Sequence, residues 1–241
     1  MLKYASITNA GSRRTNEDYI KISSVSNNHC FVVCDGLGGH SFGNVAARLA
    51  ADSFADGIHY CENISNYLQK TFIKAQQRIE FCQKESSDKR QMKTTVVCMV
   101  TDETKVYIGH IGDSRCYGFK ANGEFVRTLD HSIPQLLVQS QTITEDQIRD
   151  HPNRNMLLKV MGDVWDEPLC ELSKPLWLKE FSAFLLCSDG FWELITEEEM
   201  KETLFSSSTP QEWLDKMVEI VVSNGNGRKM DNYSAIVVIN Q

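Results

Sequence analysis

Five aspartates stand beside strand-like segments of this chain, and their placement is the most informative chemical pattern in the sequence. Asp35, Asp113 and Asp189 each follow an apolar run where a strand would end, whereas Asp18 and Asp231 each precede one. Because strand ends are rigid, carboxylates placed there can be held within the small tolerance that a metal site needs. Carboxylate oxygens without cysteine or histidine partners favour hard cations, so the pattern indicates a Mg²⁺ or Mn²⁺ site.

The two Asp-Gly pairs among these residues have a simpler interpretation, because Asp-Gly is also a common turn sequence. Their recurrence favours the metal site: Asp35-Gly36 follows Val-Val-Cys, and Asp189-Gly190 follows Leu-Leu-Cys-Ser. Converging carboxylates would raise each other's pKa and would need cations to stay ionised. The glycine lets the backbone pass close to a cation, which makes the Gly36 carbonyl a further candidate ligand.

The glycine-rich run after Asp35 must also be compared with a dinucleotide-binding loop. Its spacing does not fit, because Ser41 stands where the third glycine of that fingerprint should be. Asp35 would also place negative charge beside the pyrophosphate. Arg13, five residues before Asp18, is suited to grip a phosphate ester through its paired donors, although a surface arginine in a turn is the simpler alternative.

The elements that must position these side chains follow from apolar spacing. We expect strands over 4–8, 19–25, 30–34, 94–100, 105–111, 115–119, 124–127, 170–178, 182–187 and 233–239. We expect helices over about 43–54, 64–84, 196–205 and 210–222. We also expect a polar helical stretch over 132–162, interrupted by a mobile excursion over the surface at 141–150. The short polar turns at 102–103 and 121–123 predict antiparallel hairpins.

These elements cluster in blocks of strands and blocks of helices, which argues against a doubly wound parallel sheet. Two packed antiparallel sheets with helix pairs outside them fit better, which is an α+β arrangement within the mixed α/β class. The sequence contains no linker rich in Pro, Gly or Ser and no internal repeat. We therefore expect one domain over residues 1–241.

Composition narrows the classes of partner and compartment. The 241 residues carry 25 Lys+Arg against 32 Asp+Glu, a formal charge of −7, which argues against nucleic acid or an anionic membrane as main partner. No apolar run approaches the roughly 20 residues of a membrane span, and the first residues do not resemble a signal peptide. The eight cysteines lack a Cys-x-x-Cys pair and several lie in apolar runs, so we expect buried, reduced thiols in a cytoplasmic protein.

A set of short motifs runs in order over nearly the whole chain. They are Arg13-x-x-Asn16-Glu17-Asp18, Val33-Cys34-Asp35-Gly36-Leu37-Gly38-Gly39-His40, Thr94-Thr95, Gly112-Asp113-Ser114-Arg115, Asp130-His131-Ser132, Leu158-x-x-Met161-Gly162, Cys187-Ser188-Asp189-Gly190 and Asp231-Asn232-Tyr233-Ser234. One motif alone would be weak, but the ordered set is specific. On these residues the chain resembles the metal-dependent protein phosphatase 2C family, close to its compact bacterial members.

The resemblance implies a central β-sandwich flanked by helices and an enzyme that hydrolyses phosphoserine and phosphothreonine in proteins. It implies two bound Mn²⁺ or Mg²⁺ ions and a weaker third. By the resemblance, Asp35 would bridge the first and second ions, and the Gly36 carbonyl would bind the first ion. Asp189 and Asp231 would complete the coordination of the second ion, and Asp113 with Asp189 would hold the third. Glu17 and Asp18 would act through waters bound to the metals. Arg13 would bind the substrate phosphate, and residues 133–154 would form the variable flap.

By this resemblance, hydroxide generated between the metals attacks phosphorus in line, and no phosphoenzyme is needed. One position departs from many eukaryotic relatives, which carry a histidine as general acid directly after the Asp-Gly pair. Here that position is Leu37, which cannot donate a proton. His40 lies nearby, and a structural role at the start of a helix is expected for it.

Three other phosphatase chemistries leave signatures that this sequence lacks: Cys-x₅-Arg, Asp-x-Asp and Asp-x-His. Two alternatives stay open. One is a catalytically silent relative that binds phosphoproteins as a regulatory module, although such proteins tend to lose metal ligands. The other is the same chemistry on a small phosphate ester. The expected partners are phosphoproteins and an opposing serine/threonine kinase pathway, and a monomer is expected.

Overall fold

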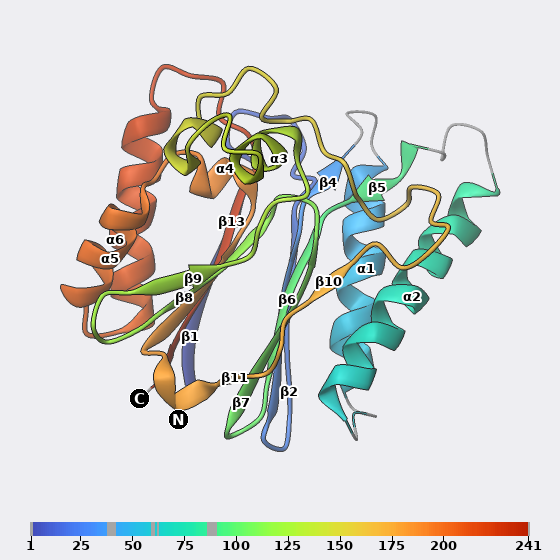
Figure 1. The fold of residues 1–241 in the computed structure, drawn as a ribbon, viewed down its shortest axis with the longest axis horizontal. Coiled ribbons are helices and arrows are strands. Elements are labelled where there is room, and N and C mark those ends of the chain that lie inside the picture. The colour runs from blue at the N-terminus through green and yellow to red at the C-terminus, as the bar shows by residue number, and fades with distance from the viewer. Residues whose placement is uncertain (1, 38–41, 59–60, 62, 86–90, 241) are drawn as a thin grey trace.

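The structure of this chain is a computed structural model that describes residues 2–37, 42–58, 61, 63–85 and 91–240. Two β-sheets pack face to face, and a pair of helices covers the outer face of each (Figure 1). This four-layer arrangement confirms the predicted antiparallel sandwich flanked by helix pairs.

The first sheet contains β1 (Leu2–Asn9), β8 (Arg115–Phe119), β9 (Phe125–Arg127), β12 (Ala183–Cys187) and β13 (Tyr233–Asn240). Its order is β1-β13-β12-β8-β9, and every neighbouring pair is antiparallel. The first and last strands of the chain therefore lie side by side.

The second sheet contains β2 (Tyr19–Val25), β3 (Asn28–Cys34), β6 (Val96–Thr101), β7 (Lys105–Ile111), β10 (Glu171–Leu172) and β11 (Leu176–Trp177). Its order is β10-β7-β6-β3-β2, and β11 pairs with β7. The continuous strand predicted over 170–178 is wrong: β10 and β11 are separate, because Pro175 between them has no N–H to donate to the ladder. A short ribbon of β4 (Gly36–Leu37) and β5 (Lys93–Thr94) extends one end of this sheet.

The helices pack in two pairs. Contacts join α1 (Gly43–Gly57) and α2 (Ile64–Gln83) to each other and α1 to β2 and β3, whereas α5 (Glu197–Phe205) packs on α6 (Pro210–Gly225), which contacts β1 and β13. Thr196 and Glu199 form a capping box at the start of α5, in which each side chain accepts from the other residue's backbone N–H. Asn63 caps α2, and Thr209 caps α6 ahead of a proline in its first turn.

The core consists of three apolar layers, one between the sheets and one under each helix pair. Strand β3 shows how a strand serves two of them. Phe31 and Val33 face the opposite sheet, whereas Cys30, Val32 and Cys34 pack under the helices. Because side chains alternate along a strand, a fully apolar run is needed where both faces are buried.

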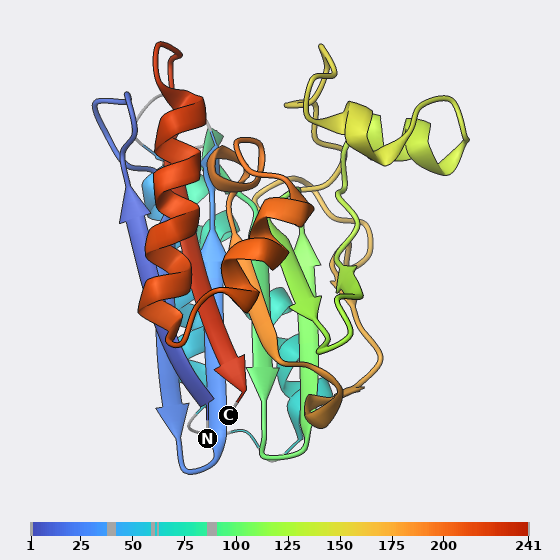
Figure 2. The same ribbon diagram turned by 90° about the vertical axis from the view of Figure 1, so that its left-hand side faces the viewer.

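The stretch from 132 to 162 contains less helix than predicted. It contains α3 (Ile133–Gln139) and a 3₁₀ turn, η3 (Glu145–Ile148), and its remaining residues form turns and loops. Gln141 has a positive φ of 60°, which no helix interior accommodates. In Figure 2 the segment with α3 and η3 extends beyond the end of the sheets.

Both predicted hairpins are confirmed, since β6 pairs with β7 and β8 with β9. Between these two hairpins, the chain passes from the second sheet to the first after β7.

All eight cysteines are free, as expected, but Cys61, Cys82 and Cys170 are only partly buried. Within the described ranges, no helix combines the length and apolar character required to span a lipid bilayer.

Candidate metal centre and phosphate site

A cleft of about 290 Å³ opens at one end of the sandwich. Its lining residues are Arg13, Arg14, Thr15, Glu17, Asp35, Gly36, Leu37, Asp113, Asn155, Leu157, Asp189, Asp231 and Asn232. The structure therefore gathers into one cleft every predicted site residue except Asp18, which is buried close by. The predicted site residues are separated by up to 218 positions in the sequence, and the two sheets bring them together.

Each aspartate reaches the cleft from the end of an element. Asp35 follows β3, Asp113 follows the turn after β7, and Asp189 begins the short helix α4 (Asp189–Trp192) after β12. Asp231 stands two residues before β13. The ends of β3, β7 and β12 and the start of β13 lie at the same end of the two facing sheets, so these aspartates meet there.

Asp35 and the glycine after it are held by the β4–β5 ribbon. The Asp35 N–H donates to Thr95 Oγ1 at 3.0 Å, and the Asp35 carbonyl accepts from Thr95 N–H at 2.8 Å and from Thr94 Oγ1 at 2.9 Å. A Cβ on Gly36 would lie 2.3 Å from the backbone carbon of Gly43, so only glycine fits there. The predicted importance of the Asp-Gly pair thus has a steric reason.

The carboxylates of the cleft disfavour each other's charge. Burial raises the pKa of Asp35, Asp113 and Asp189 above the usual range, and the negative charge of Asp189 adds to the shift of the other two. A nearby divalent cation would reverse this effect, because it stabilises the ionised form. Asp35, Asp113 and Asp189 therefore have the character of a cation site.

Asp18 lies beneath the cleft with 6% of its surface exposed. Its Oδ2 accepts a hydrogen bond from Ser188 Oγ at 2.7 Å, while its Oδ1 is buried with no hydrogen-bond partner among the described residues. Burial, and to a lesser degree the charges of Asp189 and Asp231, raise its pKa to about 7. An oxygen left without a donor at this depth fits a site that holds a cation and its waters.

Arg13 does not stand free for a substrate. Its Nη2 and Nε donate to the two carboxylate oxygens of Asp231 at 2.7 and 3.0 Å, a bidentate pair at the mouth of the cleft. The pair is partly exposed, and it raises the pKa of Arg13. The predicted phosphate-binding side chain and a predicted metal ligand are thus bound to each other.

Sequence reasoning gave no role to several residues that organise the site. Asn232 Oδ1 accepts from the Glu17 N–H at 2.8 Å, and its Nδ2 donates to the carbonyls of Ala10 and Thr15. Trp192 Nε1 donates to the Asp113 carbonyl at 3.0 Å. The positions of Asn232 and Trp192 beside the aspartate motifs were the only sign in the sequence that they belong to the site.

His40 and the glycines at 38 and 39 lie outside the described residues.

A comparison with known families matches residues 8–230 to the model of protein phosphatase 2C. The chain belongs to the protein phosphatase 2C family. This confirms the predicted resemblance and the predicted enzyme class, a protein phosphatase.

Individual members of the protein phosphatase 2C family resemble the chain over nearly its full length. A serine/threonine phosphatase stp of Listeria monocytogenes is 30% identical over 94% of this chain and 90% of its own length. The structure of serine/threonine phosphatase Stp1 from Staphylococcus aureus superimposes with a TM-score of 0.89 at 28% identity, covering 100% of this chain and 96% of that one. The catalytic domain of phosphatase PstP, solved in complex with 2 manganese ions, shares the fold at 23% identity, with a TM-score of 0.82 over 99% of this chain and 97% of that one.

Proposed function

We propose that this chain is a divalent-metal-dependent phosphatase that removes phosphate from phosphoserine and phosphothreonine in proteins. The observation that carries the proposal is the convergence of Asp35, Asp113, Asp189 and Asp231 in one cleft beside Arg13. Burial raises the pKa of Asp35, Asp113 and Asp189, and cations bound among them would favour their ionised forms.

The donor set fits Mn²⁺ or Mg²⁺, since its side-chain ligands would be carboxylate oxygens. We propose that Asp35, the Gly36 carbonyl, Asp189 and Asp231 would together hold two ions, with Asp35 shared between them, Gly36 serving the first and the other two aspartates the second. Glu17 and Asp18 would act through water, and Asp113 with Asp189 would hold a third ion. When bound, such ions supply a water of lowered pKa as the nucleophile and offset charge on the phosphoryl oxygens.

Arg13 would change partner during the reaction. With Asp231 holding a metal ion, Arg13 would lose its bidentate pair, and its guanidinium donors would be free to bind the substrate phosphate. There it would hold the phosphoryl group and stabilise charge on its oxygens. The pair seen here therefore keeps Arg13 at the mouth of the cleft.

Leu37 lines the cleft and has no proton to donate, and no histidine is among the described lining residues. We propose that the leaving serine or threonine oxygen takes its proton from water in the cleft. This differs from a mechanism in which a side-chain acid protonates the leaving group.

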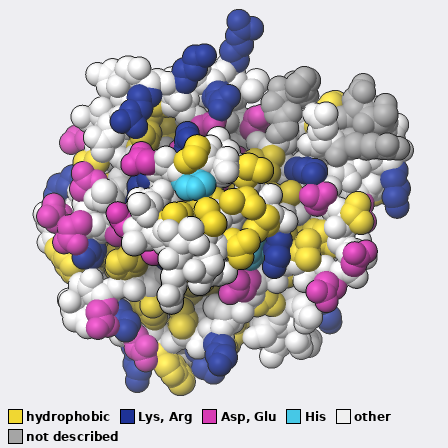
Figure 3. Space-filling view, turned by 45° about the horizontal axis from the view of Figure 1, so that its top comes forward, with side chains coloured by type: hydrophobic (Ala, Val, Ile, Leu, Met, Phe, Trp, Pro, Cys, Tyr) yellow, Lys and Arg dark blue, Asp and Glu magenta, His cyan; other side chains and the backbone are white. Residues whose placement is uncertain are grey.

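The surface around the cleft favours a protein as substrate over a small ester. Asn155 and Leu157 line the cleft, whereas the alternate residues Met156 and Leu158 are 53% and 48% exposed. Leu136 on α3 is 51% exposed. Figure 3 shows hydrophobic side chains gathered near the centre of this face of the molecule, with charged side chains of both signs around them. A polypeptide could cover such an apolar surface, which a small ester would leave in water.

We further propose that residues 1–241 form a single catalytic domain with residues 133–154 as its flap, and that it acts as a monomer in the cytoplasm. A serine/threonine kinase must supply its substrates, because only phosphorylated side chains can be hydrolysed. The hydrophobic residues near the flap suggest that this segment takes part in choosing among them.

The test is phosphate release from a phosphothreonine peptide, measured with Mn²⁺ and again with EDTA. We expect release only with metal, and we expect Asp35→Asn to lose at least about a hundredfold in kcat, because it removes the bridging carboxylate. Asp215→Asn, at an exposed position on α6, is the matched control and should leave kcat unchanged.

Two results would count against the proposal. Full activity in EDTA would exclude the metal mechanism. Binding of the phosphopeptide by folded, metal-loaded protein without any release would instead identify a silent phosphoprotein-binding module.

A further inference from the structure

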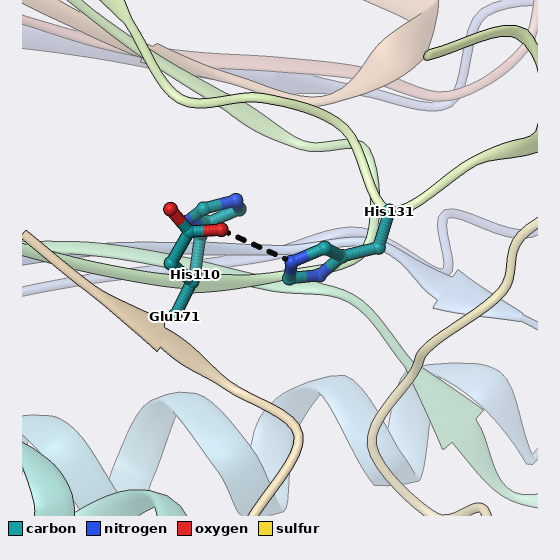
Figure 4. Close-up of side chains that lie close together, drawn as sticks. All are labelled: His110, His131 and Glu171. Carbon is teal, nitrogen blue, oxygen red and sulfur yellow. Dashed lines mark ion pairs between the residues drawn. The ribbon is translucent and has the colours of Figure 1, made fainter. Parts of the chain in front are cut away.

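A cluster of titratable side chains lies outside the cleft, on the edge of the second sheet. His110 on β7, His131 after β9 and Glu171 on β10 bring their nitrogen and oxygen atoms within 4.8 Å of one another (Figure 4). Both histidines are buried, and Glu171 is exposed. The His131 Nε2 faces Glu171 Oε2 at 3.6 Å.

Two histidines and a glutamate suggest a transition-metal site, but the hydrogen bonds argue against one. The Gly112 N–H donates to His131 Nδ1 at 3.2 Å, so the neutral His131 ring carries its proton on Nε2, the nitrogen that faces Glu171. The two rings are also stacked, with centroids 4.7 Å apart and planes within 10° of parallel. A metal lies close to the plane of each imidazole that binds it, and no single ion can lie in both of these planes.

The same contacts give His131 another role, which concerns the turn after β7. Its ring accepts from the Gly112 N–H, and its own backbone N–H donates to the Gly112 carbonyl at 2.8 Å. One residue therefore binds both polar backbone groups of Gly112. Burial lowers the pKa of His131 to about 3, so the ring stays neutral and its Nδ1 stays an acceptor at physiological pH.

Gly112 determines the direction in which the chain leaves β7. Its φ is +99°, a conformation that disfavours other residues, and a Cβ there would lie 2.6 Å from Thr95 Cγ2. The next residue, Asp113, is 4% exposed and lines the cleft. A change in the Gly112 peptide would therefore move the carboxylate of Asp113.

We propose that His131 is a positioning residue for Asp113: its Nδ1 fixes the Gly112 peptide so that the Asp113 carboxylate points into the metal cleft. The stack on His110 holds the ring in place, and the His110 Nε2–H in turn donates to the Leu129 carbonyl at 2.8 Å. Glu171 Oε2 lies 3.6 Å from the outer nitrogen of His131, at the exposed rim of the cluster. The role rests on the proposed function, in which Asp113 binds a cation.

Two substitutions separate the acceptor from the stacked ring. His131→Asn keeps an acceptor, because the asparagine Oδ1 occupies the place of Nδ1, but it loses the stack. His131→Phe keeps the stack and loses the acceptor. We expect His131→Phe to weaken Mn²⁺ binding at the weakest site about tenfold, with a fall in kcat and little change in KM, as for other residues that orient metal ligands. His131→Asn should stay within about threefold of wild type.

Mn²⁺ affinity is measured by calorimetry, and hydrogen exchange of the Gly112 amide is followed by NMR in metal-free protein. We expect exchange to speed up about fivefold in His131→Phe and to stay near wild type in His131→Asn. If His131→Phe does not fold, His131→Gln replaces it, because its acceptor lies further out and cannot reach the Gly112 N–H.

Equal losses in the asparagine and phenylalanine variants would overturn the proposal, since the acceptor would not be the cause. Wild-type Mn²⁺ affinity in folded His131→Phe would also overturn it. An inactive wild-type enzyme would contradict only the proposed function, because Mn²⁺ affinity and Gly112 exchange still decide the role of His131.

Discussion

Replacing Asp18 with asparagine should stabilise the metal-free protein at pH 8, although it removes a site residue. Bringing the pKa of Asp18 from 3.8 to about 7 corresponds to a cost of about 4 kcal/mol for keeping the buried carboxylate ionised, at about 1.36 kcal/mol per pH unit. The asparagine would still accept from Ser188. Its amide N–H groups would take the place of Oδ1, which has no hydrogen-bond partner among the described residues, and burying these donors unpaired would cost about 1–3 kcal/mol. A net gain of about 1–3 kcal/mol remains.

The sign of the pH dependence follows from proton binding. Between pH 4 and 7 the folded state keeps the proton on Asp18 that the unfolded chain has released, so wild-type stability falls as pH rises through this range. Asp18→Asn has no such group. Its advantage should therefore be complete at pH 8 and should disappear by about pH 5.

The measurement is urea unfolding in EDTA at pH 8 and pH 5, with the exposed Asp215→Asn as control. Adding Mn²⁺ should reverse the order, because the wild-type carboxylate then stabilises the bound cation and its waters. The reasoning is refuted if Asp18→Asn is no more stable than wild type at pH 8, or if its advantage is the same at both pH values.

Three further predictions concern the phosphate site, the buried ion pair and the Asp-Gly motif. Arg13→Ala should raise KM for a phosphopeptide about tenfold with a smaller change in kcat. If KM and kcat of the variant both equal those of the wild type, Arg13 does not bind the substrate phosphate. Arg115 pairs bidentately with buried Asp130 at 2.7 and 2.8 Å, so Arg115→Met should lower the free energy of unfolding in urea by about 3–5 kcal/mol. Lys120→Met, which breaks a surface pair with Glu124, should lower it by less than about 1 kcal/mol. Gly36→Ala should abolish Mn²⁺ binding in calorimetry because its Cβ would collide with backbone, and wild-type affinity would contradict that geometry.

Local patterns predicted most of the elements. The apolar period gave α2 (Ile64–Gln83) within one residue, and β2, β7 and β8 with the bounds found in the structure. The prediction failed where polar turns govern the chain. Residues 132–162 form turns and short helices, where the polar helical pattern predicted more helix.

The site was predicted through its strand ends, because an aspartate directly after an apolar strand has a fixed place in a rigid frame. The residues that form hydrogen bonds around those aspartates were not predicted. Asn232 and Glu17 are 215 positions apart, and only the adjacency of β13 to the start of the chain brings them together. The role of His131 was hidden for the same reason, since its motif gave no sign that its ring would bind the backbone of Gly112.

The sequence by itself determined the sandwich, the family and the carboxylates that the chemistry needs, because period, composition and ordered motifs are local properties of the chain. Only the tertiary structure decided which groups meet. The crossing from β7 to β8 carries Asp113 between the sheets, and Arg13 is bound to Asp231. Asp18 is buried with an oxygen that has no hydrogen-bond partner in the described part of the chain. These facts depend on packing between distant segments, where desolvation and the proximity of like charges set the energies.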